Sequence, residues 1–243
     1  MSIKGLNILA VVPARGGSKG IPRKNLRKVG GLSLIARAAR VAGALDWIDH
    51  SVISTDDPEM AEEGRRFGLE APFTRPEHLA GDTALGIDVW KHAWLASEDY
   101  YNKKFHVSVK LEPTSPLRRP EDIEKTVRMV IDKGHPAAAT ISPTPAHYTP
   151  HKTLTVSGEG IIGFYLEDGA KFSLRQGIPE YYHRNGICYA ATRKHVVHQG
   201  MIIDETAAAV IIQRPVVNID DMFDLEMADW LISKQEKGYG NQG

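Results

Sequence analysis

The sequence predicts an α/β fold built on a doubly wound, mostly parallel sheet, and three observations lead to this prediction. Short, continuous apolar runs rich in Val, Ile and Leu have the character of buried strands. Segments with apolar residues at helical spacing lie between these runs. The two kinds of segment alternate along most of the 243 residues, which is typical of parallel strands with helices on both faces of the sheet.

The first half of the chain supplies three helices and two of the strands. The run from 6 to 14 is apolar throughout, as expected of a strand covered on both faces. The next strand ends in two acids and leads into a helix with Asp57 as N-cap, Pro58 in its first turn and Gly68 as its stop. The elements expected here are strands at 6–14 and 50–57 and helices at 32–45, 57–68 and 83–97.

The second half of the chain continues the alternation and then interrupts it. A helix is bounded by Pro120 and Gly134, and residues 143–186 are polar, aromatic and rich in turn residues, with a hairpin expected around Ser157 and Gly158. We therefore expect a single domain over residues 1–243 with a small arm inserted at 143–186, serving dimerisation or covering a site. The other elements expected are strands at 105–116, 136–143, 187–193 and 207–220, helix 120–134, and an amphipathic helix over 221–238.

Composition narrows the class of protein. Lys plus Arg and Asp plus Glu both number 30, so the formal net charge is zero, which argues against a dedicated nucleic-acid binder. The first apolar run is too short for a membrane span or for the core of a signal peptide. Cys188 is the single cysteine and lies in an apolar strand, so it predicts no intrachain disulfide, a reducing compartment and an inert core thiol. Together these features favour a cytoplasmic protein without a membrane partner.

The loop after the first strand carries the strongest functional signal. It reads VVPARGGSKGIPRKN over residues 11–25, and ligands of doubly wound sheets lie at such strand-to-helix loops. Its glycines permit close approach of an anion to the backbone, and its cationic side chains supply charge. The spacing fits neither a Walker loop nor a dinucleotide fingerprint. A solvated basic loop is the alternative, but Pro13 and Pro22 stiffen both shoulders, which favours a polyphosphate site.

Six segments in order then resemble one family. They are VVPARGGSKGIPRKNL, VISTDDPEMAEEGRRFG, RPEHLAGDTA, LEPTSPLR, RQGIPEYYHRNGICY and VNIDDMFDLEMA, which together extend over nearly the whole chain. This set is similar to the acylneuraminate cytidylyltransferases, also called CMP-sialic acid synthetases. The resemblance implies a Rossmann-like nucleotidyltransferase fold. It also implies that CTP is coupled to an α-keto sugar acid with release of pyrophosphate, that the metal is Mg²⁺ and that the protein is a homodimer.

The resemblance also assigns roles to individual positions. Arg15, Lys19 and Lys24 are implied as catalytic cations, and Asp220 and Asn218 as metal ligands. The remaining implied positions fall into two groups. The nucleotide loop comprises Arg15, Gly16, Gly17, Ser18, Lys19, Lys24 and Asn25, and the sugar contacts are Glu112, Arg175, Gln176 and Asn185. For Asp220 the alternative is an ordinary strand-end acid or helix N-cap.

Two positions depart from the family pattern. Glu112 stands where the family usually has Gln, and its carboxylate would face a substrate carboxylate unless a cation or proton intervenes. Asn218 stands where the family usually has Asp, so one metal-binding charge is missing. Three hypotheses follow: Glu112 or Asp221 restores that charge, the sugar differs from N-acetylneuraminate, or catalysis is impaired. The open alternatives are an octulosonate or legionaminate-type acid as substrate, and a non-catalytic nucleotide or sugar-acid binding protein.

Overall fold

The centre of the molecule is a six-stranded sheet with the strand order β10-β6-β9-β5-β1-β4. The computed structural model describes residues 3, 5–172 and 177–236. Strand β1 pairs in parallel with β4 and β5, and β10 pairs in parallel with β6, whereas β9 is antiparallel to both of its neighbours. The strands are β1 (Ile8–Pro13), β4 (His50–Ser54), β5 (Val107–Lys110), β6 (Ala137–Pro143), β9 (Tyr182–Thr192) and β10 (Ala208–Ile211). The expected mostly parallel α/β sheet is confirmed.

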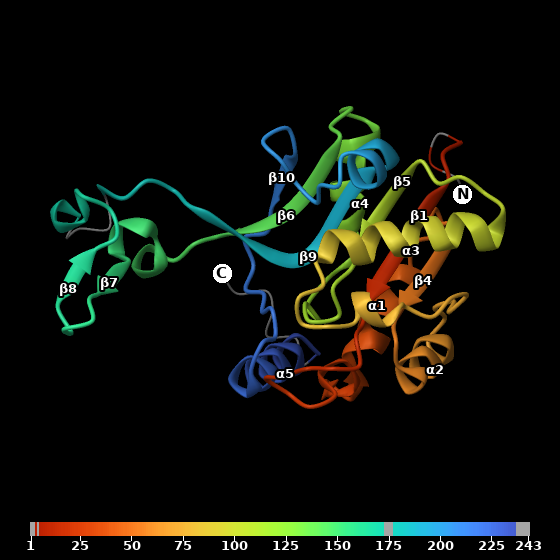
Figure 1. Ribbon diagram of the computed structural model, residues 1–243, viewed down its shortest axis with the longest axis horizontal. Coiled ribbons are helices and arrows are strands. Elements are labelled where there is room, and N and C mark those ends of the chain that lie inside the picture. Colours follow the sequence, from red (N-terminus) through yellow and green to blue (C-terminus); the bar gives the residue numbers. More distant parts are fainter. Residues whose placement is uncertain (1–2, 4, 173–176, 237–243) are drawn as a thin grey trace.

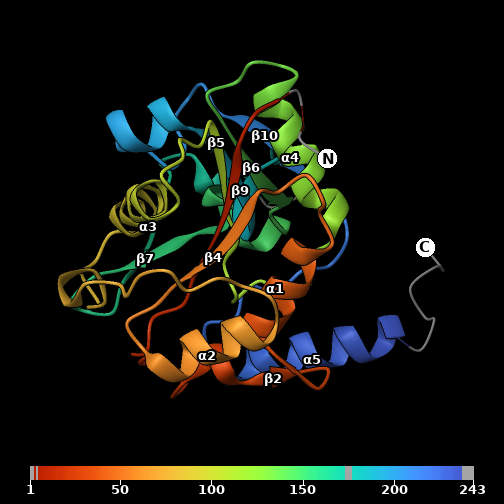
Figure 2. The same ribbon diagram turned by 90° about the vertical axis from the view of Figure 1, so that its right-hand side faces the viewer.

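Helices cover both faces of this sheet, as Figure 2 shows, with α3 on one side and α1 and α4 on the other. Side chains alternate along β1: Ile8 packs into the hydrophobic cluster with α1, α2 and α4, whereas Leu9 packs into the cluster with α3. Both faces of the strand are therefore buried, which explains its continuous apolar sequence. The helices are α1 (Leu34–Gly43), α2 (Pro58–Arg66), α3 (Gly86–Tyr101) and α4 (Pro120–Ile131).

Several boundaries differ from the sequence-based expectation. The helix expected from residue 32 begins at Leu34, because Lys28–Val29 (β2) and Leu32–Ser33 (β3) form a short antiparallel hairpin before it. The strand expected over 105–116 ends at Lys110, and the residues after it form a turn that includes a Ser115 N–H to Glu112 carbonyl bond. A one-turn π-helix, Lys194–His198, follows β9 and was missed.

Residues 144–172 and 177–181 leave the sheet between β6 and β9 and project to one side of the molecule, as Figure 1 shows. The arm expected over 143–186 is thus shorter at its ends, since Pro143 belongs to β6 and residues from Tyr182 on belong to β9. The expected hairpin is confirmed, since Leu154–Val156 (β7) pairs antiparallel with Ile162–Phe164 (β8). Short 3₁₀ turns, among them Ala146–Tyr148 and Pro150–Lys152, join this hairpin to the sheet. The side chains exposed on this arm include Leu154, Val156, Ile161, Ile162, Phe164 and Tyr165.

The last strand is shorter than the sequence suggested. Strand β10 ends at Ile211, so Asp220 does not terminate a strand but lies in an irregular segment that leads to α5 (Met222–Glu236). A backbone bond from the Ile219 N–H to the Thr114 carbonyl, at 2.8 Å, ties this segment to the loop after β5. Arg214, Pro215 and the polar residues near them supply no alternation that a sheet could bury.

Helix α5 is not amphipathic in the expected way. Ala228 and Ile232 are buried against the β2–β3 region, whereas Phe223, Met227 and Trp230 are exposed on the outside. Apolar side chains therefore occupy both sides of the helix. Among the described helices, none combines the length and the apolar composition that crossing a membrane requires.

Cys188 is fully buried in β9, and burial raises the pKa of its thiol to about 12 against the opposing charge of Arg118. Because the thiolate is the reactive form, we expect no labelling by Ellman's reagent at pH 8 while the protein is folded. In denaturant, one thiol per chain should react at once. Rapid reaction in the folded state would contradict this placement of Cys188.

Candidate active site

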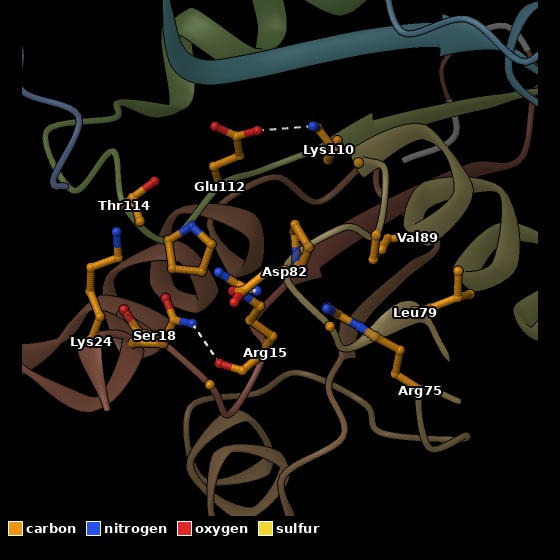
Figure 3. Close-up of a pocket in the computed structure, with 17 residues that line it drawn as sticks. Arg15, Ser18, Lys24, Arg75, Leu79, Asp82, Val89, Lys110, Glu112 and Thr114 are labelled. Atoms are coloured by element: carbon orange, nitrogen blue, oxygen red, sulfur yellow. Dashed lines mark hydrogen bonds and ion pairs between the residues drawn. The ribbon is translucent and has the colours of Figure 1, made fainter. Parts of the chain in front are cut away.

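A cavity of about 320 Å³ lies at the carboxyl ends of β1 and β5, where parallel strands deliver their loops to the same edge of the sheet. The loop after β1 forms one wall, the loop after β5 forms another, and the segment before α3 closes the side (Figure 3). Its lining residues are Pro13, Arg15, Gly17, Ser18, Lys24, Asn25, Arg75, Leu79, Gly81, Asp82, Ala84, Gly86, Val89, Lys110, Glu112, Pro113 and Thr114.

Glycines let the loop after β1 pack closely against its surroundings. A Cβ on Gly20 would lie 2.5 Å from the backbone oxygen of Asp220, so only glycine allows the loop to touch that segment. The N–H of Gly16 donates to Oδ1 of Asp56 at 3.0 Å rather than facing the cavity. Gly17, by contrast, lines the cavity. The glycines of this loop, which the sequence suggested would all face an anion, therefore have different roles.

The three cations implied for catalysis are placed differently around the cavity. Arg15 lines it, and its Nη1 donates to Oδ1 of Asp82 at 2.7 Å. Lys19 lies at the rim with its side chain 82% exposed and contacts the other oxygen of Asp82 at 2.7 Å. These two partners, Lys19 first, lower the pKa of Asp82. Lys24 lines the cavity from the other end of the loop. The loop thus presents positive charge that one carboxylate partly offsets.

Asn25 and Ser18 complete this wall. Asn25 is buried, and its Nδ2 donates to the backbone oxygen of Arg15 at 3.2 Å, which fixes the two ends of the loop to each other. Ser18 presents its side chain beside Lys24 in the cavity (Figure 3). All the residues expected in a nucleotide loop are therefore on or immediately behind one wall, with Gly16 and Lys19 at its edges.

Arg75 is a cavity residue to which the sequence reasoning gave no role, although it begins the segment RPEHLAGDTA. It is buried, and its Nε donates to Oγ of Ser54 at 3.1 Å. A second bond runs from its Nη2 to the Ser54 carbonyl. Burial lowers its pKa to about 10, against the carboxylate of Asp56, which raises it. It remains a cation at neutral pH and adds to the positive charge of the cavity.

Lys110 and Glu112 form an ion pair on the wall opposite the glycine-rich loop, with 2.9 Å between Lys110 Nζ and Glu112 Oε1 (Figure 3). Residues two apart on an extended segment share a face, so a lysine two residues before Glu112 was the signal that could have revealed this pair. Lys110 thus places a cation beside the carboxylate at position 112, as one of the sequence-based expectations required.

The segment 218–220 lies directly against the nucleotide loop. Lys24 Nζ donates to the backbone oxygen of Ile219 at 2.8 Å and lies 3.4 Å from Oδ1 of Asp220. Asn218 Oδ1 accepts a bond from Ser115 Oγ at 3.3 Å. The structure thus brings both implied metal ligands to the wall formed by the glycine-rich loop, although 195 positions separate Lys24 from Ile219.

The oxygen donors present fit Mg²⁺ only in part. In the described ranges, no three His, Cys, Asp or Glu side chains are grouped as a metal cage. The Asp220 side chain is 79% exposed beside the loop, and Mg²⁺ is commonly held by one or two carboxylates together with substrate phosphates. Asp220 could hold the ion in that way. Asp221 is placed differently, since its Oδ1 accepts from the Asp224 N–H at 2.9 Å and so caps α5.

The sugar contacts implied by the resemblance are only partly placed. Arg175 and Gln176 lie outside the described residues. Asn185 is buried between β6 and β9, where its Oδ1 accepts from Thr140 Oγ1 at 2.7 Å and its Nδ2 donates to Ser142 Oγ at 3.0 Å. It is not among the cavity-lining residues, and these bonds hold the irregular pairing of the two strands. Its sugar-binding role stays a prediction.

A doubly wound sheet with a cationic glycine-rich loop at its carboxyl edge defines the class of nucleotide-handling α/β proteins. Comparison with known proteins narrows this class. Residues 9–196 match the family model described as Cytidylyltransferase. The chain belongs to the cytidylyltransferase family, and the family resemblance seen in the sequence is confirmed.

Individual relatives match over nearly their full length. Post-translational flagellin modification protein B of Campylobacter coli is 30% identical over 229 residues, which cover 94% of this chain and 96% of that protein. CMP-N,N'-diacetyllegionaminic acid synthase of Campylobacter jejuni is 30% identical over 227 residues, 93% of this chain and 95% of that protein. A solved structure of CMP:2-keto-3-deoxy-manno-octonic acid synthetase complexed with CTP shares the fold, with a TM-score of 0.67 at 19% identity. That match covers 94% of this chain and 99% of the other.

Proposed function

We propose that the protein is a CTP-dependent enzyme that joins CMP to a sialic-acid-like α-keto sugar acid and releases pyrophosphate. The observation that carries this proposal is the cavity itself, in which a cationic nucleotide loop faces the Lys110–Glu112 pair across one space. Membership of the cytidylyltransferase family supports the reaction class. The relatives' names support a sugar acid as the second substrate.

The residues of the loop would act mainly through charge. Phosphoryl transfer demands positioning and the offsetting of negative charge rather than covalent chemistry by the protein. Arg15 and Lys24 line the cavity, and Lys19 at the rim can reach inward once its partner Asp82 is displaced by phosphate. Ser18 and Asn25 add hydrogen-bonding groups beside these cations.

The test is a substrate panel. Pyrophosphate release is measured with Mg²⁺ and each of the four nucleoside triphosphates, against nonulosonic and octulosonic acids. Release with CTP and one class of acid establishes the function and identifies the class. A legionaminate-type acid is the second candidate, favoured by the 30% identical synthase, and an octulosonate is the third. Binding of CTP in calorimetry without turnover on any acid would instead establish a non-catalytic binding protein.

We propose Asp220 as the carboxylate that holds Mg²⁺ together with the phosphates, with Asn218 as a neutral neighbour. When bound, the ion would offset charge on the phosphate oxygens. Replacing Asn218→Asp restores a second carboxylate beside the loop, so we expect half-maximal turnover at a lower Mg²⁺ concentration. The measurement is a Mg²⁺ titration of the rate. Asn102→Asp, at the far end of α3, serves as control, and an unchanged titration for Asn218→Asp would remove Asn218 from the metal site.

We also propose that the arm at 143–186 serves a homodimer. The support is its projection from the sheet and its exposed apolar side chains (Figure 1), since a contiguous apolar surface on a monomer marks an interaction site. Sedimentation as a monomer at every concentration would reject this proposal.

A further inference from the structure

The Lys110–Glu112 pair is poorly explained as a contribution to stability. Lys110 belongs to a strand of four buried residues, and its side chain is only 6% exposed. Its ammonium lies 4.6 Å from the centre of the Tyr189 ring. Placing an ammonium in such surroundings is costly, and an ion pair there is weak evidence for stability. Both residues nevertheless line the cavity, on the wall opposite the nucleotide loop (Figure 3).

The surroundings leave one oxygen of Glu112 available. Oε1 accepts from Lys110, and in the part of the chain that the structure describes, Oε2 forms no hydrogen bond. Oε2 is directed toward Gly186, where a Cβ would lie only 2.7 Å away. Gly86, at the start of α3, likewise leaves room beside Lys110 Nζ, which is 3.6 Å from its ideal Cβ position. Lys110, Glu112 and Gly86 all line the cavity, and the Glu112 side chain is 27% exposed, so a ligand in the cavity can reach its carboxylate.

The Lys110 ammonium and the Glu112 carboxylate complement two groups that are bonded to the same carbon of an α-keto sugar acid in its ring form. That carbon bears a carboxylate and the anomeric hydroxyl, and an ammonium and a carboxylate lying 2.9 Å apart offer a donor to the first and an acceptor to the second. Lys110 would also separate the substrate carboxylate from that of Glu112 and so offset their repulsion. A hydroxyl held there would lie in the same cavity as the loop where the triphosphate is expected.

We propose that in this chain Glu112, at a position where the family usually has Gln, is the general base of the reaction, and this inference rests on the proposed function. The anomeric oxygen forms a bond to the α-phosphorus, and the bond from that phosphorus to the pyrophosphate oxygen breaks. The hydroxyl proton passes to the carboxylate of Glu112, and pyrophosphate leaves with the electron pair. Glu112 returns the proton to water before the next turnover. Lys110 positions the acid through its carboxylate.

The experiment compares two replacements of Glu112 in the full-length protein. Glu112→Ala removes the base and leaves space, so kcat should fall about 100-fold or more, and added formate should restore it in a saturable way. Glu112→Gln fills the same space without a base, so kcat should fall similarly and formate should have no effect. The KM for CTP should change little in both. Glu226→Gln, on the outer part of α5, is the control for removal of a carboxylate.

A third variant tests the role of Lys110 separately from that of Glu112. Lys110→Met should raise the KM for the sugar acid about 10- to 100-fold, the value of one charge-assisted hydrogen bond, with a smaller effect on kcat. Three outcomes would overturn the proposal. The first is a Glu112→Gln variant that keeps the parental kcat. The second is a Glu112→Ala variant that folds normally but is not rescued by formate. The third is equal rescue of both variants by formate. A parent that is inactive with every acid would overturn the proposed function, and this inference with it.

Discussion

Replacing Lys24→Met is expected to lower kcat for pyrophosphate release by about 100- to 1,000-fold, the usual effect of losing one preorganised group that stabilises transition-state charge. Lys24 lines the cavity, and the carbonyl of Ile219 holds its ammonium at 2.8 Å. The position of this charge is therefore fixed before the nucleotide arrives. Methionine keeps most of the length of the side chain and removes the charge together with the hydrogen bond to Ile219.

The measurement is steady-state release of pyrophosphate at saturating CTP and sugar acid. Lys28→Met is the matched control, because Lys28 is an exposed lysine on β2 and does not line the cavity; it should behave as the parent does. Equal circular dichroism spectra would show that both variants fold. A Lys24→Met variant with the parental kcat would mean that the triphosphate is bound elsewhere.

The second large effect is expected for Gly186→Ala, in which the new methyl group would collide with the side chains of Ser115 and Glu112. Gly186 has φ +69°, and a Cβ there would lie 2.6 Å from Ser115 Oγ and 2.7 Å from Glu112 Oε2. A left-handed backbone costs a residue with a Cβ about 1–2 kcal/mol, and overpacking adds about 1–3 kcal/mol. Glu112 must also move, so turnover should fall together with stability.

Gly200→Ala separates these two costs. Gly200 has the same φ of +69° but nothing within 4 Å of its ideal Cβ position, so this variant bears the backbone cost alone. Urea or thermal unfolding should therefore show the smaller loss of stability for Gly200→Ala, with turnover unchanged. If both variants lose the same stability and Gly186→Ala keeps full turnover, the close approach of Glu112 to β9 is incorrect.

The packing of β9 against the loop after β5 also depends on Arg118. This buried side chain donates to the carbonyls of Glu112, at 2.7 Å, and Gly186, at 3.2 Å, and also bonds the carbonyl of Ile187. Burial lowers its pKa to about 10, with Cys188, Glu112 and Asp122 acting in the opposite direction. The guanidinium therefore stays charged at neutral pH and holds the backbone of Glu112 beside that of β9.

Local sequence determined the elements and their kinds. The apolar run of β1 and the proline and glycine at the ends of the α4 region predict a buried strand and a complete helix, and the structure contains both. This works because burial on both faces and helix capping are local requirements that leave a local pattern. The cationic loop was equally visible, since charge and glycine are concentrated within a few residues.

Where local patterns were weak, the predictions of element boundaries and buried faces were wrong. The strand expected over 207–220 extends only to Ile211, because Pro215 and the polar residues near it cannot continue a ladder. Helix α5 carries apolar side chains on two sides, so its composition did not reveal which side is buried. Lys110 was overlooked although its spacing from Glu112 was informative, because a lysine in a strand is ordinarily taken as solvent-exposed.

The sequence by itself determined an α/β fold, an anion-binding loop and two departures at Glu112 and Asn218. Only the tertiary structure decided that both departures border Gly186, where an ideal Cβ would lie 2.7 Å from Glu112 Oε2 and 3.5 Å from Asn218 Oδ1. It also decided that Lys110 offsets the charge of Glu112 and that Asp82 holds Arg15. Such meetings depend on where the crossovers return the chain to one edge of the sheet, and no local pattern of burial or capping encodes them.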